Sequence, residues 1–321
     1  MKSKILVVGS INMDLTVTAS RFCGAGETVF GNTFSTAQGG KGANQAIQAA
    51  RLGARVDMLG KVGNDDFGKS VTATISASGV NTQYILVSDT APTGIADIQI
   101  QKNNSGTENR ITIVTGANFD ITLNDVAFLE EKIREYSMVI LQHEIPMEIN
   151  CRVAEYAAKY NVPVMLNPAP SAKVPSELIS CLTYISPNEH EAKDIVGIAP
   201  DDESGINNTI KALHNMGVKN VIITLGKEGC AFSDSQTIIR SKSVNMGSVV
   251  DPTAAGDSFI GAFCTAVSAG IDYKKALIFA NCTAGITVTR KGAGVSLPTL
   301  DEVLAAMEQR GIDTKEYKEK L

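Results

Sequence analysis

The sequence predicts an α/β fold: a doubly wound, mainly parallel sheet flanked by helices, with a small β-sheet lid. Short β-branched runs alternate with longer segments of helical periodicity, which is typical of a parallel sheet covered on both faces. Two stretches rich in alternating Thr, Val and Ile interrupt this rhythm, and the chain after Asp257 is almost wholly helical in pattern. We expect residues 1–321 to form a single domain built on one large sheet.

The elements of the main sheet follow from the spacing of apolar residues. The expected strands are Ile5–Val8, Val56–Leu59, Met138–Leu141, Val162–Leu166, Leu182–Ile185 and Val221–Leu225. Helices are expected at Gly42–Leu52, Leu123–Tyr136, Glu148–Tyr160 and Thr209–Met216. The charged C-terminal segment Thr314–Leu321 is expected to be frayed.

The small sheet is expected from residues 15–37 and 94–114, where helix formers are scarce. Apolar and polar residues alternate there, as in strands with one solvated face. We expect these strands to be antiparallel and to form a lid that leaves and rejoins the main fold.

Composition excludes several classes of protein. The net charge of −5 leaves no basic excess to neutralise a nucleic-acid backbone, so we expect no nucleic-acid partner. No stretch approaches the roughly 18 apolar residues of a membrane span, and no signal peptide is evident. The six cysteines have no CxxC spacing and the three histidines no zinc pattern. We therefore expect a cytoplasmic protein.

The stretch GNDDFGKS, residues 63–70, satisfies the phosphate-loop pattern G-x-x-x-x-G-K-[ST]. Such a loop turns backbone N–H groups and a lysine toward an anion. Here Asp65 and Asp66 would stand in the cradle and repel a phosphate. We interpret the stretch as an ordinary strand-to-helix loop.

The segment Asp251–Phe259 is the most informative part of the sequence. Ala254, Ala255 and Gly256 are small enough for a ligand to approach the backbone at the start of a helix, where free N–H groups favour an anion. Asp257 follows and could accept the proton of an attacking hydroxyl. Asp257 could equally be a helix cap, for which aspartate is a preferred residue.

Other polar residues stand at the carboxyl ends of expected strands, where ligands of such sheets gather. Asn12 and Asp14 are two apart, so both face the same way on a strand and suit neighbouring sugar hydroxyls. The turn Gly39–Asn44 leads into a helix on which Lys41 and Asn44 could share a face. Glu144 follows another strand.

Two further segments suit a nucleotide and its metal. Asn188 and Glu191 offer an amide and a carboxylate to a hard cation such as Mg²⁺, although an acidic first helical turn explains them as well. Thr224–Gly229 ends a strand with two glycines, as nucleotide-contacting loops and many hairpins do.

Taken together, these segments resemble the ribokinase family of carbohydrate kinases, from about Lys4 to Pro298. The resemblance rests chiefly on Gly39–Asn44 with Gln45 and Ala46, and on Asp251–Asp257. It is supported by Gly9–Asp14, Gly26–Thr28, Asn167–Pro170 and Arg290–Ala293. One departure is Pro252, where many members carry threonine; proline lacks an N–H and favours an extended backbone at Asp251.

The resemblance implies ATP-dependent phosphorylation of a primary hydroxyl, the 5-hydroxyl of ribose, with Mg²⁺ and with K⁺ as a monovalent activator. It implies Asp257 as the base and the amides of Ala254, Ala255, Gly256 and Asp257 as an anion hole. The sugar would be bound by Asn12, Asp14, Gly40, Lys41, Asn44, Glu144 and Asp257. The nucleotide would meet Asn188, Thr224, Gly226, Gly229, Gly256 and Asn281, with Glu191 in the magnesium region. Potassium would lie at Asp251, Thr253, Thr287, Arg290, Gly292 and Ser296. A homodimer through the lid is also implied.

Rival functions remain open at this point. Within the family they are a deoxyribokinase, a nucleoside kinase and a kinase of an already phosphorylated sugar, although the sugar motifs supply only Lys41 as a cation for a second phosphate. Outside enzymes, the chain could be a sugar or nucleotide sensor without turnover.

Overall fold

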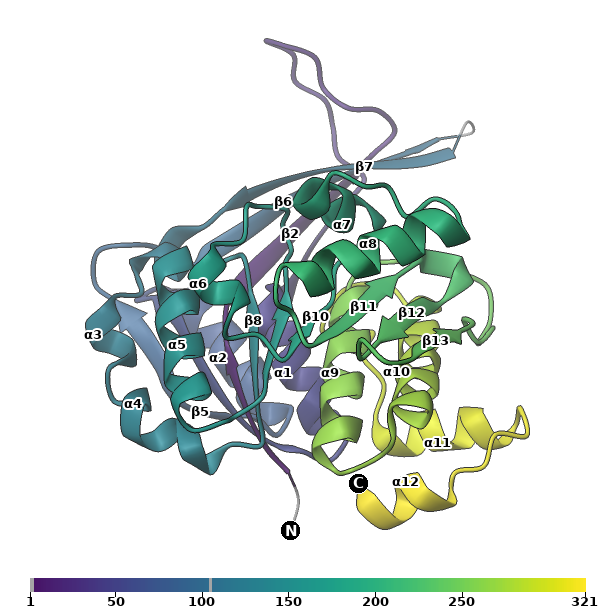
Figure 1. The fold of residues 1–321 in the computed structure, drawn as a ribbon. Coiled ribbons are helices and arrows are strands. Elements are labelled where there is room, and N and C mark those ends of the chain that lie inside the picture. The colour runs from purple at the N-terminus through teal and green to yellow at the C-terminus, as the bar shows by residue number, and fades with distance from the viewer. Residues whose placement is uncertain (1–2, 104–105) are drawn as a thin grey trace.

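The chain folds around one large twisted sheet, described here from a computed structural model that covers residues 3–103 and 106–321 (Figure 1). The sheet has nine strands in the order β13-β12-β11-β10-β9-β8-β1-β4-β5. Its strands are β1 (Lys4–Val8), β4 (Arg55–Gly63), β5 (Asn81–Ser88), β8 (Met138–Gln142), β9 (Val164–Asn167), β10 (Tyr184–Ile185), β11 (Asn220–Thr224), β12 (Cys230–Ser233) and β13 (Ile238–Ser241). All neighbours from β5 to β11 pair in parallel, and only β12 and β13 run antiparallel at one edge.

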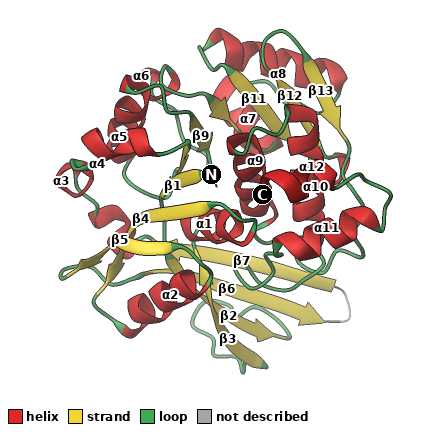
Figure 2. Ribbon diagram, turned by 90° about the horizontal axis from the view of Figure 1, so that it is seen from below, coloured by secondary structure: helices red, strands yellow, loops and turns green. Residues whose placement is uncertain are grey.

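Helices cover both faces of this sheet, as the alternation of elements predicted (Figure 2). The helices are α1 (Lys41–Arg51), α2 (Asp66–Ala77), α3 (Leu123–Val126), α4 (Leu129–Lys132), α5 (Met147–Lys159), α6 (Ser176–Ile179), α7 (Glu189–Val196), α8 (Glu203–Asn215), α9 (Ala255–Ser268), α10 (Tyr273–Thr287), α11 (Leu300–Glu308) and α12 (Lys315–Lys320). In β1, Ile5 and Val7 pack into one hydrophobic core and Leu6 and Val8 into the other. The expected doubly wound fold is confirmed.

A second sheet of four strands, in the order β3-β2-β6-β7, lies across one end of the main sheet (Figure 1). Its strands are β2 (Asn12–Ala19), β3 (Thr33–Gly39), β6 (Gly94–Asn103) and β7 (Gly106–Val114). The expectation of purely antiparallel pairing is wrong, because β2 and β6 pair in parallel. This pairing is possible because each strand enters the sheet from the same end of the main fold, after β1 and after β5.

Two helix predictions need correction. The expected helix Leu123–Tyr136 is broken into α3, α4 and a 3₁₀ turn, since backbone bonds such as Ala127 N–H to Asn124 C=O span only three residues. Helix α8 begins at Glu203 rather than Thr209, because the side chain of Asp202 caps it by accepting from the Gly205 N–H.

The C-terminal segment is also not frayed, contrary to expectation. It forms α12, in which Tyr317 is 2% exposed and stacks on Phe279 at 5.2 Å between ring centroids. One buried aromatic side chain thus anchors an otherwise charged helix. Among the described residues, no helix is both long and apolar enough to span a bilayer.

The stretch that matches a phosphate loop is a capped strand-to-helix loop. The Asp65 carboxylate caps α2 by accepting from the Gly68 N–H at 2.7 Å. It also accepts from the Thr93 N–H at 2.8 Å and the Thr93 hydroxyl at 2.6 Å. Lys69 is exposed and pairs with Asp66. The acidic side chain therefore occupies the position that an anion would need.

We predict that Asp65→Ala lowers the free energy of unfolding by about 1–2 kcal/mol, because it removes a helix cap and leaves buried donors at Thr93. Lys69→Ala should leave both stability and nucleotide affinity unchanged. Urea denaturation and ATP titration check this, and weakened ATP binding in Lys69→Ala would contradict our interpretation of the loop.

Candidate active site

A cavity of about 220 Å³ opens at the carboxyl ends of the central strands, beside the start of α9. The predicted site residues that line it are Lys41, Asn188, Glu191, Thr224, Ala254, Ala255, Gly256 and Asp257. Sequence reasoning assigned no role to the other lining residues, which are Asn167, Ala169, Ser186, Pro252 and Ile260. Asn167 ends β9, so its place at a strand's carboxyl end was the available signal.

The first turn of α9 presents backbone donors to this cavity. Ala254 precedes the helix with φ +61°, a left-handed conformation uncommon outside glycine. The Ala255 N–H is already bonded to the Pro252 carbonyl at 3.2 Å. The Gly256 and Asp257 N–H groups belong to the first helical turn, which has no acceptors within the helix. These two amides, with the helix dipole, make an anion site.

Asp257 is buried at the base of this turn, and α1 holds its carboxylate. The Asn44 amide donates to Oδ2 at 3.0 Å and the Gln45 amide donates to Oδ1 at 2.9 Å. Both oxygens therefore have a fixed partner, which sets the orientation of the carboxylate beside the cavity. Helix capping by its side chain, the alternative considered from the sequence, is not observed.

Helix α1 reaches Asp257 because its first turn packs closely against the segment between β1 and β2. Gly40 has φ +89°, and a Cβ there would lie 2.8 Å from the Asn12 nitrogen and the Ser10 oxygen. A Cβ at Gly42 would lie 2.7 Å from the Ser10 nitrogen. Both positions thus require glycine. This packing accounts for both glycines, and the contact of Gly40 with a sugar stays a prediction.

A cluster of charge surrounds Lys41. Burial raises the pKa of Asp14 to about 7, and the charges of Glu144 and Asp257 add to the increase. Burial alone would lower the pKa of the Lys41 ammonium, but Asp257, Glu144 and Glu191 raise it overall. Glu144 accepts hydrogen bonds from the Ser10 hydroxyl and the Lys41 N–H. The predicted sugar residues therefore meet in one place, around a single cation.

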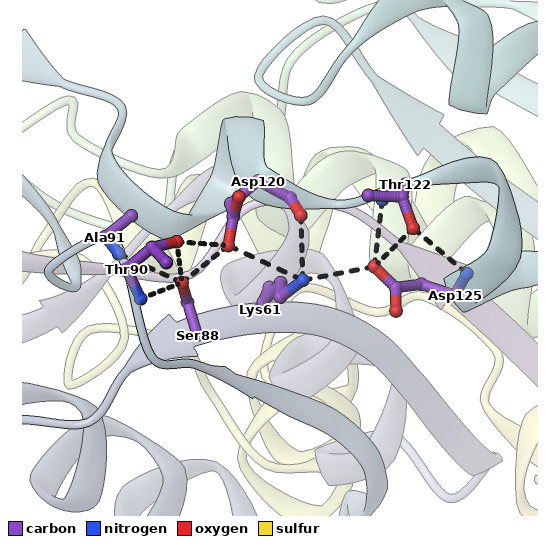
Figure 3. A network of polar contacts seen from close by, with 7 residues as sticks. All are labelled: Lys61, Ser88, Thr90, Ala91, Asp120, Thr122 and Asp125. Atoms are coloured by element: carbon purple, nitrogen blue, oxygen red, sulfur yellow. Dashed lines mark hydrogen bonds and ion pairs between the residues drawn. The ribbon is translucent and has the colours of Figure 1, made fainter.

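Asn12 is held by the turn that follows the small sheet. Asn118, in the 3₁₀ turn η1 (Gly116–Asp120), donates to Asn12 Oδ1 at 2.7 Å and also bonds both backbone groups of Ile11. Figure 3 shows how the turn is anchored: Lys61 Nζ donates to the Asp120 carbonyl at 2.8 Å and to Asp125 at 3.1 Å. This bond uses one lone pair of the Asn12 oxygen and fixes the orientation of the amide, whose NH₂ group remains available as a donor.

Asn188 and Glu191 line the cavity and also form a capping box at the start of α7. Glu191 accepts from the Asn188 N–H and Asn188 accepts from the Glu191 N–H, both at 2.9 Å. Burial raises the pKa of Glu191, while the Asn188 N–H and Lys41 lower it to a smaller extent. Glu191 thus lies in an acidic first helical turn, as the alternative interpretation expected, and both residues also line the cavity.

The remaining nucleotide residues take different positions. Thr224 bridges to Asn188 and lines the cavity. Asn281 lies apart from the lining, with its amide bonded to the Ser241 hydroxyl at 2.9 Å and to nearby carbonyls. Gly229 approaches the Ser241 carbonyl closely. Gly229 and Asn281 therefore both lie against Ser241, the last residue of β13.

The loops proposed for a monovalent cation are adjacent. The Asp251 carboxylate accepts from the Thr253 N–H at 3.0 Å and the Gly292 N–H at 2.9 Å. Burial would raise the pKa of Asp251, but these bonds hold it below its usual value. Arg290 pairs with Glu302 at 2.7 Å, while the Thr287 and Ser296 hydroxyls donate to backbone carbonyls nearby.

Comparison with known proteins identifies the family. Residues 2–300 match the pfkB family of carbohydrate kinases. The chain belongs to this family. It is 40% identical over 301 residues to a ribokinase of Bacillus subtilis, covering 93% of this chain and 97% of that protein. A deoxyribokinase of Salmonella typhi is 32% identical over 301 residues, with 93% and 96% coverage.

A solved structure supports the same membership. The chain resembles an Arabidopsis thaliana ribokinase complexed with ribose and ATP, with a TM-score of 0.89 and 33% sequence identity. The similarity covers 96% of this chain and 99% of that one. The family expected from the motifs is confirmed, and the carbohydrate kinase fold extends over nearly the whole chain.

We predict that Gly256→Ala separates stability from ligand binding. A Cβ at Gly256 would meet open space, so alanine should raise the free energy of unfolding by about 0.5 kcal/mol. The same methyl group enters the cavity beside the anion site, so the KM for ATP should rise at least about tenfold, or 1.4 kcal/mol. Denaturation and steady-state kinetics check both effects; an unchanged KM would exclude phosphate from this turn.

We predict a pH-dependent effect of Asp14→Asn on stability without ligand. Since the folded pKa of about 7 exceeds the usual value, Asp14 stabilises the fold fully below about pH 4, and this contribution is lost as pH rises to about 7. Relative to wild type, Asp14→Asn should gain about 1 kcal/mol or more between pH 4 and pH 8. Urea denaturation at both values checks this, with the exposed Asp201→Asn as control; equal effects at both pH values would contradict it.

Proposed function

We propose that this chain transfers the γ-phosphoryl group of ATP to the 5-hydroxyl of D-ribose, giving ribose 5-phosphate and ADP. The observation that carries the proposal is the position of the Asp257 carboxylate, which lies between the polar cluster around Lys41 and the free amides of α9. A base, an anion site and a group of hydroxyl-binding side chains thus meet at one cavity. The relatives named above support ribose and ATP as the substrates.

In this proposal the sugar lies against Asn12, Asp14, Lys41, Asn44 and Glu144. The 5-hydroxyl points at Asp257, which accepts its proton as the new oxygen–phosphorus bond forms. The bond between the γ-phosphorus and the bridging oxygen breaks, and ADP leaves with that electron pair. Because the transition state is loose, the site chiefly aligns the reactants and stabilises charge on the phosphoryl oxygens through the Gly256 and Asp257 amides.

Magnesium would neutralise charge on the ATP phosphates. The described residues contain no group of three or more His, Cys, Asp or Glu side chains arranged to hold a metal ion. This fits Mg²⁺, which usually retains waters and binds through one or two carboxylates and the substrate phosphates. Glu191, buried and lining the cavity, is the carboxylate we assign to that region.

Potassium would bind between the loop at Asp251–Thr253 and the segment from Thr287 to Ser296. The hydrogen bond between Asp251 and Gly292 already joins the two loops, so carbonyl groups from both could share one ion. Through Pro252, the same loop reaches the turn that begins α9. In this arrangement a bound cation would stabilise the geometry of the anion site.

The small sheet is proposed to act as a lid over the sugar and to pair with a second copy of the chain. Exposed apolar side chains on its strands support this, namely Phe34 on β3 and Ile111, Ile113 and Val114 on β7. Closure would exclude water from the γ-phosphoryl group. The proposed enzyme acts in the cytoplasm, where ATP and sugar meet.

We predict that Asp257→Asn lowers kcat by about 100-fold or more, since the proton acceptor is lost. Sugar affinity should change little, because asparagine keeps the shape of the side chain. The matched control is Asp272→Asn at the start of α10, where the aspartate caps the helix by accepting from the Lys275 N–H and pairs with the Lys275 ammonium on the surface. Near-normal turnover in Asp257→Asn would overturn the assignment.

The test of the function is ATP-dependent phosphorylation of ribose, 2-deoxyribose, fructose, adenosine and fructose 6-phosphate, with and without potassium. A large kcat/KM advantage for ribose is expected. Preference for deoxyribose or adenosine would leave the role of Asp257 intact and refute the assignment of the sugar. No ATP consumption with any of them would favour a sensor without turnover.

A further inference from the structure

Asp257 is the end point of two chains of side-chain amides. In the first, Gln142 Nε2 donates to Gln45 Oε1 at 2.7 Å, and Gln45 donates to Asp257. In the second, Gln38 Nε2 donates to Asn44 Oδ1 at 3.2 Å, and Asn44 donates to Asp257. Each carboxylate oxygen is therefore reached by an amide whose own oxygen is held by a glutamine behind it.

The direction of these chains is fixed by chemistry. An ionised carboxylate only accepts hydrogen bonds, so a neighbouring amide must turn its NH₂ group toward it. The oxygen of that amide then points away and needs a donor, which Gln142 supplies to Gln45 and Gln38 to Asn44. Gln45 Nε2 also lies 3.1 Å from Asn167 Oδ1, a second acceptor that requires the same orientation.

Burial makes this arrangement strict. Gln45 and Gln142 are fully buried, and Gln38 and Asn44 are 6% and 5% exposed. Within the described residues, Gln142 Oε1 and Gln38 Oε1 are buried without a hydrogen-bond partner. A buried oxygen without a partner lowers the stability of the fold, so stability alone does not explain why a glutamine stands at either position. Gln142 directs its N–H toward Gln45, and Gln38 directs its NH₂ group toward Asn44 and also donates to the Gly39 carbonyl at 2.8 Å.

We propose that Gln142 and Gln38 are positioning residues for phosphoryl transfer. They fix the orientation of the Gln45 and Asn44 amides, which in turn hold the Asp257 carboxylate aligned for the attacking hydroxyl. Neither glutamine lines the cavity. The inference rests on the proposed function for its kinetic consequence, and on geometry alone for the coupling between Gln142 and Asp257.

The chain contains a matched control on α1. Gln48 is fully buried, donates a single hydrogen bond to the Pro298 carbonyl at 2.9 Å, and also has an unpartnered oxygen. It therefore resembles Gln142 in burial and bonding, but its hydrogen bond ends on the Pro298 carbonyl rather than on a neighbour of Asp257. Gln48→Met and Gln142→Met remove the same chemical group from similar surroundings.

The first experiment compares the kinetics of these two variants. In Gln142→Met the Gln45 oxygen loses its donor and is left buried without a partner, so the amide should shift and kcat should fall about tenfold or more, as expected for misalignment at a reacting centre. The KM for ribose should stay within about twofold, because the sugar-binding side chains remain. Gln48→Met should keep the wild-type kcat. Equal kcat values in Gln142→Met and Gln48→Met would overturn the proposal.

The pH profile of Gln142→Glu gives a sharper test. When protonated, the new carboxyl can still donate to Gln45. When ionised, it only accepts, so Gln45 has acceptors on both sides and its NH₂ group cannot satisfy Asp257 and the new carboxylate together. Burial raises the pKa of a carboxyl, so this change should fall in an accessible range. We expect kcat of this variant, relative to wild type, to fall as pH rises. A ratio of the two kcat values that stays constant at all pH values would contradict the proposed effect of Gln142 on Asp257.

A double-mutant cycle tests the coupling between Gln142 and Asp257 without a measurement of turnover. Asparagine at position 257 can donate as well as accept, so residue 257 no longer requires the NH₂ group of Gln45. The thermal midpoint of Gln142→Met with Asp257→Asn should therefore shift by less than the sum of the single shifts, whereas Gln48→Met with Asp257→Asn should be additive. If the wild-type protein phosphorylates no sugar, the proposed function fails, but this cycle still tests whether Gln142 is coupled to Asp257. Additive shifts of the thermal midpoint for Gln142→Met and Asp257→Asn would refute that coupling.

Discussion

The close approach of α1 to the segment between β1 and β2 is the constraint on which the site depends. Gly40 and Gly42 leave no room for a Cβ, so the first turn of α1 lies directly against backbone. This brings Lys41, Asn44 and Gln45 to residues that are distant in sequence, Glu144 and Asp257. A Cβ at either glycine would push α1 away, and the side chains of Lys41, Asn44 and Gln45 would move with it.

The same packing concentrates acidic groups around one lysine. Asp14, Glu144, Asp257 and Glu191 all act on Lys41 or on one another, and burial raises the pKa of Asp14 and Glu191. Such a cluster destabilises the folded state in the absence of ligand. Sugar hydroxyls can donate to these carboxylates and so relieve part of that cost. The site is therefore arranged for an occupant rather than for stability.

Much of this could be read from the sequence, because β-branched runs, glycine turns and strand-end polar residues have local signatures. The starts of α1 and α9 and the roles expected at Asp257 and Lys41 rest on such signals. The parallel pairing of β2 with β6 and the burial of Tyr317 could not be predicted, since both depend on segments far apart in the chain. Gln142 and Asn118 were missed for the same reason: a buried amide is significant only through the partner it meets.

The balance of charge also argues against a sugar that already carries a phosphate. Among the described residues that line the cavity, Lys41 is the one cation, while Glu191 and Asp257 are acidic. Lys41 is already surrounded by Asp257, Glu144 and Glu191. A second phosphate would need Arg or Lys side chains of its own, and near these carboxylates it would be repelled. In the proposed mechanism the γ-phosphoryl group is accommodated differently, since the amides of α9 would stabilise an anion without a side-chain charge. Neutral donors for the phosphoryl group and acidic acceptors for hydroxyls together select an uncharged polyol as the acceptor.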